Sequence, residues 1–110
     1  MADFIKNLPK SEVLPLAAQV EYLPGQIVSK TLAQNAHHSL TLFAFDEGEE
    51  ISTHASGGDA MVTVLDGTGK ITIDGVDHQV AAGQCIVMPA GKPHALFAQE
   101  RFKMFLVVIF

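Results

Sequence analysis

The sequence is short of cysteine and of positive charge. Cys85 is the single cysteine among 110 residues, so no disulfide can close within the chain, and a reducing compartment such as the cytoplasm is expected. The chain has seven Lys and Arg and 12 Asp and Glu, which gives a formal net charge of −5. The basic residues are scattered singly along the sequence. A nucleic-acid-binding face needs clustered Lys and Arg. The composition therefore argues against a nucleic-acid partner.

Apolar segments of the length that a membrane requires are also missing. The longest apolar run, Met104–Phe110, has seven residues, whereas a spanning helix needs about 20. The N-terminal sequence MADFIKNLPK has no long apolar core behind a basic start, so it does not resemble a signal peptide. No membrane partner is expected, and a soluble cytoplasmic protein is predicted.

Short strands separated by turns dominate the part of the chain that begins at Gln26. The hydrophobic fraction of 48% is enough for the core of one domain of this length. Stretches rich in Val, Ile, Thr and Phe, several alternating in period two, are typical of β-strands. The predicted strands are Gln26–Leu32, Ser39–Phe45, Glu50–His54, Ala60–Leu65, Lys70–Ile73, His78–Val80, Gln84–Met88, His94–Ala98 and Lys103–Phe110.

Turn signals fall between these strands. Asp66-Gly67 and Asp74-Gly75 are strong hairpin dipeptides, and Gly57-Gly58 and Ala90-Gly91 indicate two further reversals. Many short strands with regular turns predict an all-β sandwich or barrel of antiparallel strands. Residues 1–25 contain three prolines and are predicted to form an irregular arm, which leaves residues 26–110 for the barrel.

Strand alternation also predicts which surfaces are covered. The C-terminal stretch Lys103–Phe110 is apolar on both faces, so both faces should be covered, the outer one by the N-terminal arm or by another subunit. Apolar strands left in water are an aggregation hazard, and two-fold pairing is the commonest way to cover them. A homodimer is predicted, with Lys103–Phe110 and Gln26–Leu32 as its contributors. Cys85, in a strand with apolar neighbours, is expected to be buried.

Two stretches carry a family resemblance. The first motif runs Gly48, five residues, His54, one residue, Ser56, three residues, Ala60, six residues, Gly67. The second runs Gly83, five residues, Pro89, one residue, Gly91, two residues, His94, three residues, Ala98. They resemble the two signature motifs of the cupin superfamily, which have Gly, His, His, Glu, Gly and Gly, Pro, Gly, His, Asn at these positions. The resemblance implies a small single-domain cupin, an antiparallel double-stranded β-helix or jelly-roll barrel of the RmlC-like kind.

The resemblance also implies a degenerate metal site. In metal-binding cupins, two His and a Glu of the first motif and the His of the second converge inside the barrel. Here His54 and His94 remain, whereas Ser56 and Ala60 replace the other two ligands. Metals held by His and carboxylate usually have three or more protein ligands. A weakly bound divalent metal (Zn, Fe, Mn or Ni) on His54 and His94 is the expectation, with Asp59 as a third ligand only if the Gly57-Gly58 turn brings it inward.

The same residues also suit a pocket for a small molecule. An imidazole pair beside a hydroxyl in an apolar barrel makes a site of the common kind, mostly apolar with a few converging polar groups. The predicted ligand-binding residues are His54, Ser56, His94, Val62 and Met88. Three functions stay open: binding of an unidentified small molecule, a metal-dependent enzyme of the dioxygenase or isomerase type, and a structural or regulatory oligomerisation module. No catalytic residue is assigned.

Overall fold

The structure, a computed structural model, describes residues 4–110, and this range consists almost entirely of β-strands and turns, with no α-helix. A short 3₁₀ turn, η1 (Leu16–Gln19), precedes the strands. The strands are β1 (Ile27–Gln34), β2 (His38–Phe45), β3 (Glu50–His54), β4 (Asp59–Asp66), β5 (Thr68–Ile73), β6 (Val76–Ala81), β7 (Cys85–Met88), β8 (His94–Phe97) and β9 (Phe102–Ile109). Each predicted strand is present, with its ends shifted by two residues or fewer. In the part of the chain that the structure describes, no helix is long and apolar enough to cross a membrane.

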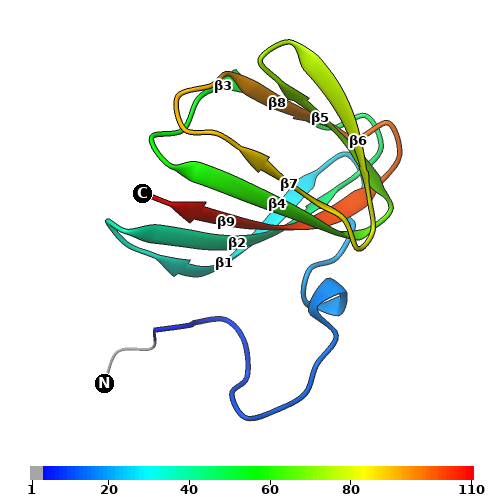
Figure 1. Ribbon diagram of the computed structural model, residues 1–110. Helices are drawn as coiled ribbons and strands as arrows, with labels where there is room; N and C mark the ends of the chain where they lie inside the picture. Colours follow the sequence, from blue (N-terminus) through cyan, green and yellow to red (C-terminus); the bar gives the residue numbers. More distant parts are fainter. Residues whose placement is uncertain (1–3) are drawn as a thin grey trace.

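The strands form two sheets that face each other (Figure 1). The larger sheet has the order β1-β2-β9-β4-β7 and the smaller β3-β8-β5-β6, and every pairing is antiparallel. The chain changes sheet repeatedly: β3 and β8 pair in one sheet although four strands, β4 to β7, lie between them in the sequence. This connectivity is that of a jelly-roll barrel, and the predicted fold class is confirmed.

The core lies between the two sheets, and alternation along β4 illustrates how the sequence builds it. Ala60, Val62 and Val64 point inward and are almost fully buried, whereas Met61 on the opposite face is exposed. Aromatic rings fill the end of the barrel away from the cavity described below, where Phe45 and Phe102 stack with their ring centroids 4.5 Å apart.

The expected burial of Cys85 is wrong. The register pairs Thr63 with Cys85 and Met61 with Val87, and these residues occupy the outer face of the sheet. Cys85 is therefore exposed, while the intervening Ile86 faces the core. The adjacent Ile86 is apolar because it belongs to the inner face, and alternation then places Cys85 on the opposite, outer face.

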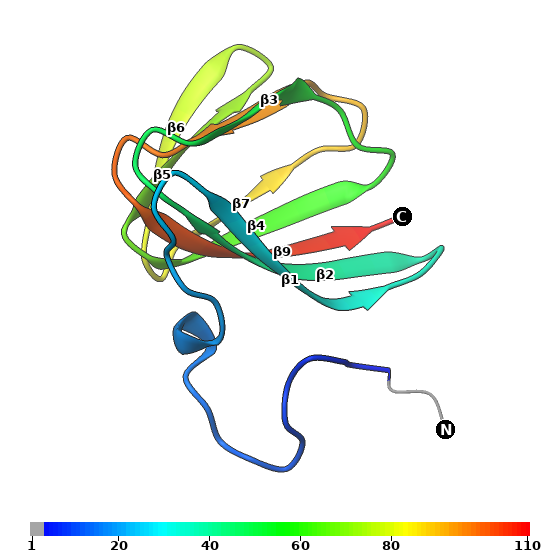
Figure 2. The same cartoon turned by 180° about the vertical axis from the view of Figure 1, so that it is seen from behind.

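The N-terminal arm runs along the outer side of the larger sheet (Figures 1 and 2), and near its start the Lys6 amide donates to the Leu32 carbonyl of β1 at 2.8 Å. Val20 of the arm is buried in a second cluster with Leu32, Leu42 and Ala44, and the Phe105 ring of β9 packs against this cluster. The arm thus covers the outer face of β9 near its start. It does not cover the end of β9, where Ile109 is 57% exposed.

Candidate functional site

The candidate site lies at the open end of the barrel, where two motif strands meet. His54 is the last residue of β3 and His94 is the first residue of β8. The antiparallel register of these two strands places the two histidines directly opposite each other. The two sequence motifs are far apart in the chain, and strand pairing is what brings their histidines together.

The two imidazole rings touch edge to face. Their centroids are 4.3 Å apart at an interplanar angle of 75°, and the two Nε2 atoms are 3.1 Å apart. The Nδ1 atom of His54 is 2.9 Å from the Ser52 carbonyl oxygen, which can only accept, so Nδ1 carries the proton and Nε2 carries a lone pair. The Nε2–H of His94 then donates to this lone pair. In that arrangement the buried Nδ1 of His94 has no hydrogen-bond partner among the described residues.

The two histidines differ in their environment. His54 is exposed at the barrel mouth, whereas His94 is only 3% exposed. Burial lowers the pKa of His94 below its ordinary value of 6.5, and the charge of His54 lowers this pKa further. The backbone of Lys92 raises it, but by less than the other two effects lower it. His94 is therefore a neutral imidazole at neutral pH.

The lowered pKa of His94 predicts a specific dependence of stability on pH. The unfolded chain takes up this proton near pH 6.5, and the native state takes it up only at lower pH. Stability is therefore fully present above pH 6.5 and is lost as the pH falls from there to the native pKa. Urea unfolding between roughly pH 8 and pH 5 should reveal this loss. His94→Asn should make the free energy of unfolding depend less on pH, whereas His37→Gln, at an exposed turn, should not. If the pH dependence of His94→Asn equalled that of the wild type, His94 would not be its cause.

A cavity of about 310 Å³ opens beside the histidine pair. Among residues 4–110, its polar lining residues are His54, Ser56 and His94, and no Asp, Glu, Lys or Arg of this range contributes to it. The other lining residues are Phe43, Ile51, Ala55, Ala60, Met88, Leu96, Met104, Leu106 and Val108. The site is thus an apolar pocket with a small polar edge.

Ser56 lies at the cavity and also shapes the loop around it. Its Oγ accepts a hydrogen bond of 3.2 Å from the Gly58 amide, and its carbonyl oxygen accepts one of 2.9 Å from the Gly91 amide. The first bond lies within the turn after β3, and the second joins this turn to the loop between β7 and β8. Ser56 therefore helps to set the shape of the mouth.

The structure brings four of the predicted ligand-binding residues to the cavity and leaves one outside it. His54, Ser56, His94 and Met88 line it. Val62 does not; it is fully buried in the core. The cavity instead uses Met104, Leu106 and Val108 of β9, which the prediction omitted although their alternation in the C-terminal strand signals an inward face.

Three further polar residues, Asp59, His37 and His38, lie away from the cavity. Asp59 accepts a hydrogen bond of 2.8 Å from the Ala90 amide, is exposed and does not line the cavity. His37 is exposed, and His38 has its Nε2 3.0 Å from the side-chain nitrogen of Asn35. Neither His37 nor His38 lines the cavity.

The histidine pair could supply two of the ligands that a metal ion needs. Two nitrogens 3.1 Å apart would subtend an angle of roughly 95° at one ion about 2.1 Å from each, and the bond from His54 Nδ1 to a carbonyl matches the usual outer shell of a metal-bound His. Within residues 4–110, however, no three His, Cys, Asp or Glu side chains are grouped so that they could hold a metal ion. Ala60 supplies only a methyl group. The residues present do not fit a tightly held metal.

The fold and the paired motif histidines define a small jelly-roll barrel with an imidazole pair at its mouth. A family model described as "Cupin domain" matches residues 41–110, and the chain belongs to this family. The structure is similar to that of a conserved protein of unknown function from Streptococcus pyogenes, with 48% identity, a TM-score of 0.96, and coverage of 98% of this chain and 95% of that one.

Two further similarities extend the comparison. A cupin superfamily protein from Desulfitobacterium hafniense DCB-2 matches with 34% identity and a TM-score of 0.92, over 96% of this chain and 97% of that one. Among curated proteins, the dimethylsulfoniopropionate lyase DddW of Ruegeria pomeroyi is 26% identical over 93 residues, which are 80% of this chain. The match spans 61% of the length of that lyase.

Proposed function

We propose that the protein binds a small, uncharged molecule that has an apolar body and one polar head, with the head against the histidine pair. The observation that carries this proposal is the lining of the cavity, in which His54, Ser56 and His94 are the polar side chains and the rest is hydrocarbon, aromatic ring and thioether. A pocket of about 310 Å³ lies at the small end of the range for ligand sites.

The charges around the cavity support an uncharged ligand. Among the described residues no Lys or Arg lines it, and burial lowers the pKa of His94, so neither a Lys, an Arg nor the His94 imidazole offers a positive charge to an anionic ligand. Transferring an unpaired carboxylate into such a pocket would cost its hydration without replacing it. A hydroxyl or carbonyl head needs only the hydrogen bonds that Ser56 and the imidazoles can exchange.

Methionine methyl groups provide a direct test with internal controls. Met88 and Met104 line the cavity, whereas Met61 lies on the outer face of β4. In protein labelled at the methionine methyl carbons, titration with phenol or benzyl alcohol should shift the NMR signals of Met88 and Met104 and leave that of Met61 unchanged. Benzoate should bind more weakly than benzyl alcohol. Equal shifts for all three methionines, or tighter binding of benzoate, would contradict the proposal.

Replacing each histidine should separate binding from stability. Both His54→Ala and His94→Ala are expected to abolish the benzyl alcohol response. His54 is exposed, so water can replace it as the acceptor for His94, and its removal should change the free energy of unfolding by only about 1 kcal/mol. His94 is buried, so its removal should cost about 1–3 kcal/mol. His78→Ala, on β6 and away from the cavity, serves as the control. Binding retained in both site variants would mean that the two histidines are structural.

A second candidate function is a metal-dependent enzyme, and the similarity to a lyase favours it. In this case a divalent ion (Zn, Fe, Mn or Ni) would be held by His54 and His94 and would act as a Lewis acid toward a bound substrate. Elemental analysis of protein purified without a metal-affinity tag separates the two functions. Stoichiometric metal that resists prolonged chelation supports the enzyme, and metal lost on brief chelation supports the binding protein. A purely structural module is disfavoured by the cavity, which such a module does not need.

A further inference from the structure

The cavity beside the histidine pair is a slot whose depth follows from the strand register. At the mouth, Ala60 of β4 is paired with Met88 of β7 on one side and with Val108 of β9 on the other. Farther in along β9, the lining residues are Leu106 and then Met104. An antiparallel strand advances by about 3.4 Å per residue, so this lining extends about 13 Å from Val108 to Met104.

Aromatic rings close the inner end of the slot. Phe43 of β2 is the register partner of Met104 and also lines the cavity. Its ring centroid lies 6.0 Å from that of Phe45, which in turn stacks on Phe102. Phe45 and Phe102 are fully buried and do not line the cavity, so the slot ends at Phe43 and Met104.

The inner walls of the slot are apolar surface that the protein leaves accessible. Phe43 and Leu106 point between the sheets and pack against the core, yet neither is fully buried. Because both line the cavity, their accessible surface faces its interior. Covering apolar surface of this kind with hydrocarbon removes it from water, which is favourable.

The dimensions of the slot fit one extended chain. A volume of about 310 Å³ spread over about 13 Å leaves a width of about 5 Å, which is close to the spacing of neighbouring strands in a sheet. A water molecule takes up about 30 Å³ in the liquid, so the cavity has room for roughly ten atoms of that size. An extended backbone advances about 3.4 Å over three bonds, so roughly eight to ten carbon atoms and a head group span the slot.

The two ends of the slot differ in polarity. The histidine pair lies at the mouth, and Ser56 follows in the turn after β3. The next register pair inward on the smaller sheet is Ile51 and Leu96, and among the described residues the lining from there to Phe43 is apolar. A ligand with a polar head therefore enters with its head at the mouth and its body inward.

Resting on the proposed function, we infer that the ligand is an unbranched aliphatic alcohol or aldehyde of about eight to ten carbon atoms. Its oxygen lies against the histidine pair, and its terminal methyl group reaches Phe43 and Met104. Compact ligands such as benzyl alcohol leave the inner end of the slot empty and bind more weakly than octanol.

A series of straight-chain alcohols measures the length of the slot. In calorimetric titrations, affinity should rise about fourfold per methylene group from butanol to octanol, because each added group leaves water for the apolar walls. The rise should stop beyond decanol, and cyclohexanol should bind more weakly than hexanol. Octanol binding no tighter than butanol, an undiminished gain up to dodecanol, or cyclohexanol binding tighter than hexanol would overturn the inference.

Two methionines report the orientation of the bound chain. Met88 lies at the mouth and Met104 at the inner end, so nuclear Overhauser contacts should join the terminal methyl of octanol to the Met104 methyl. The methylene group next to the oxygen should contact the Met88 methyl, and butanol should contact Met88 alone. The reverse pattern would overturn the inference, and this measurement needs no substituted protein.

A ring placed halfway along the slot should shorten it. Leu106→Phe adds bulk on the cavity side of β9 and should weaken octanol binding by about 16-fold or more, which is the effect of two methylene groups. Butanol affinity should change less than twofold. The matched control is Val107→Phe, because Val107 pairs with the exposed Met61 on the outer face of the sheet. Equal effects of the two substitutions on octanol binding would contradict the position of the chain.

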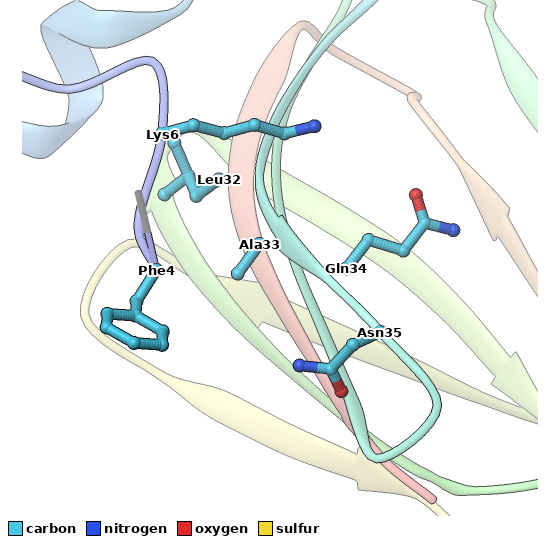
Figure 3. A pocket seen from close by; sticks show the side chains of 6 residues that line it. All are labelled: Phe4, Lys6, Leu32, Ala33, Gln34 and Asn35. Atoms are coloured by element: carbon cyan, nitrogen blue, oxygen red, sulfur yellow. The ribbon is translucent and has the colours of Figure 1, made fainter. Parts of the chain in front are cut away.

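Hollows on the N-terminal arm offer another place for an alkyl chain and provide a second control. Figure 3 shows Phe4 and Lys6 beside Leu32 and Ala33 of β1, around a hollow of about 190 Å³. Phe4 also lines a hollow of about 400 Å³ on the arm itself. Its side chain is 91% exposed, so Phe4→Ser should fold and keep the octanol affinity of the wild type. Loss of octanol binding in Phe4→Ser would place the chain on the arm and overturn the inference.

The chain ligand and the proposed function fail in different ways. Methionine responses to butanol and benzyl alcohol without any gain for octanol would overturn the chain ligand alone. No response of Met88 or Met104 to any of the alcohols would overturn both.

Discussion

Ser56→His combined with Ala60→Glu is expected to convert the histidine pair into a stoichiometric metal site, with affinity for Zn²⁺ or Mn²⁺ raised by about 100-fold or more. Removing one residue that hydrogen-bonds to a metal ligand commonly lowers metal affinity by about 10–100-fold. Adding two direct metal ligands, His at position 56 and Glu at position 60, should therefore raise the affinity at least as much. The two Nε2 atoms already lie 3.1 Å apart, as neighbouring ligands of one ion would. Ala60 lines the cavity, so a longer side chain at this position enters open space.

The same variant should depend on metal for its stability. Without metal, Glu at position 60 would place a carboxylate at a site that is 1% exposed, and this burial should lower the melting temperature. Bound metal compensates this charge, so the melting temperature should rise with metal concentration, in the variant far more than in the wild type. Isothermal titration calorimetry and thermal melts with and without chelator measure both effects.

A control on the same strand makes this result specific. Met61→Glu adds the same side chain one residue along β4, where it points outward, and should leave metal affinity unchanged. If the double variant gained no affinity, the two histidines would not be arranged as metal ligands. If the wild type retained one metal ion per chain after treatment with a chelator, the site would include a ligand other than the residues that line the cavity. The metal-dependent enzyme would then be the preferred function.

The fold followed from the sequence because strand and turn signals are local. Hairpin dipeptides such as Asp74-Gly75 fix where a strand reverses, and period-two alternation fixes which side chains point inward. The N-terminal arm has no such signal. Its path depends on bonds to distant residues, such as the one from Lys103 to the Ala17 carbonyl, so only its irregularity could be predicted.

The site could be predicted less completely, for a geometric reason. Motif spacing identified His54 and His94, and alternation gave the inward face of Val62 correctly, but alternation does not give depth along the barrel axis. Depth is set by the register between strands far apart in sequence, and that register leaves Val62 in the core and brings Val108 of β9 to the cavity. The contrast between an exposed His54 and a buried His94 has a different origin, because the register places the two residues at the same level. His54 lies on β3, the edge strand of its sheet, whereas His94 lies on β8, which is flanked by β3 and β5.

Gly58→Ala is expected to destabilise the protein by about 3 kcal/mol, at the upper end of what overpacking usually costs. A Cβ at this buried position would lie 2.3 Å from the Ile109 carbonyl oxygen and 2.8 Å from its carbon, and these are backbone atoms that cannot rotate away. β9 cannot retreat either, because it is paired with β2 on one side and with β4 on the other. Its end is held further by the bond from the Phe110 amide to the His37 carbonyl, at 2.9 Å.

Gly57→Ala is the matched control, because a Cβ on the preceding residue would meet no heavy atom within 4 Å. Its melting temperature should stay close to that of the wild type, whereas that of Gly58→Ala should fall by ten degrees or more, at roughly 4–8 °C per kcal/mol for a domain of this size. The clash would also displace the turn whose Gly58 amide donates to Ser56 Oγ, so binding of benzyl alcohol should weaken in Gly58→Ala alone. Equal melting temperatures for the two variants would mean that the turn between β3 and β4 can move away from the end of β9, and that the close approach at Gly58 does not hold the mouth of the cavity in place.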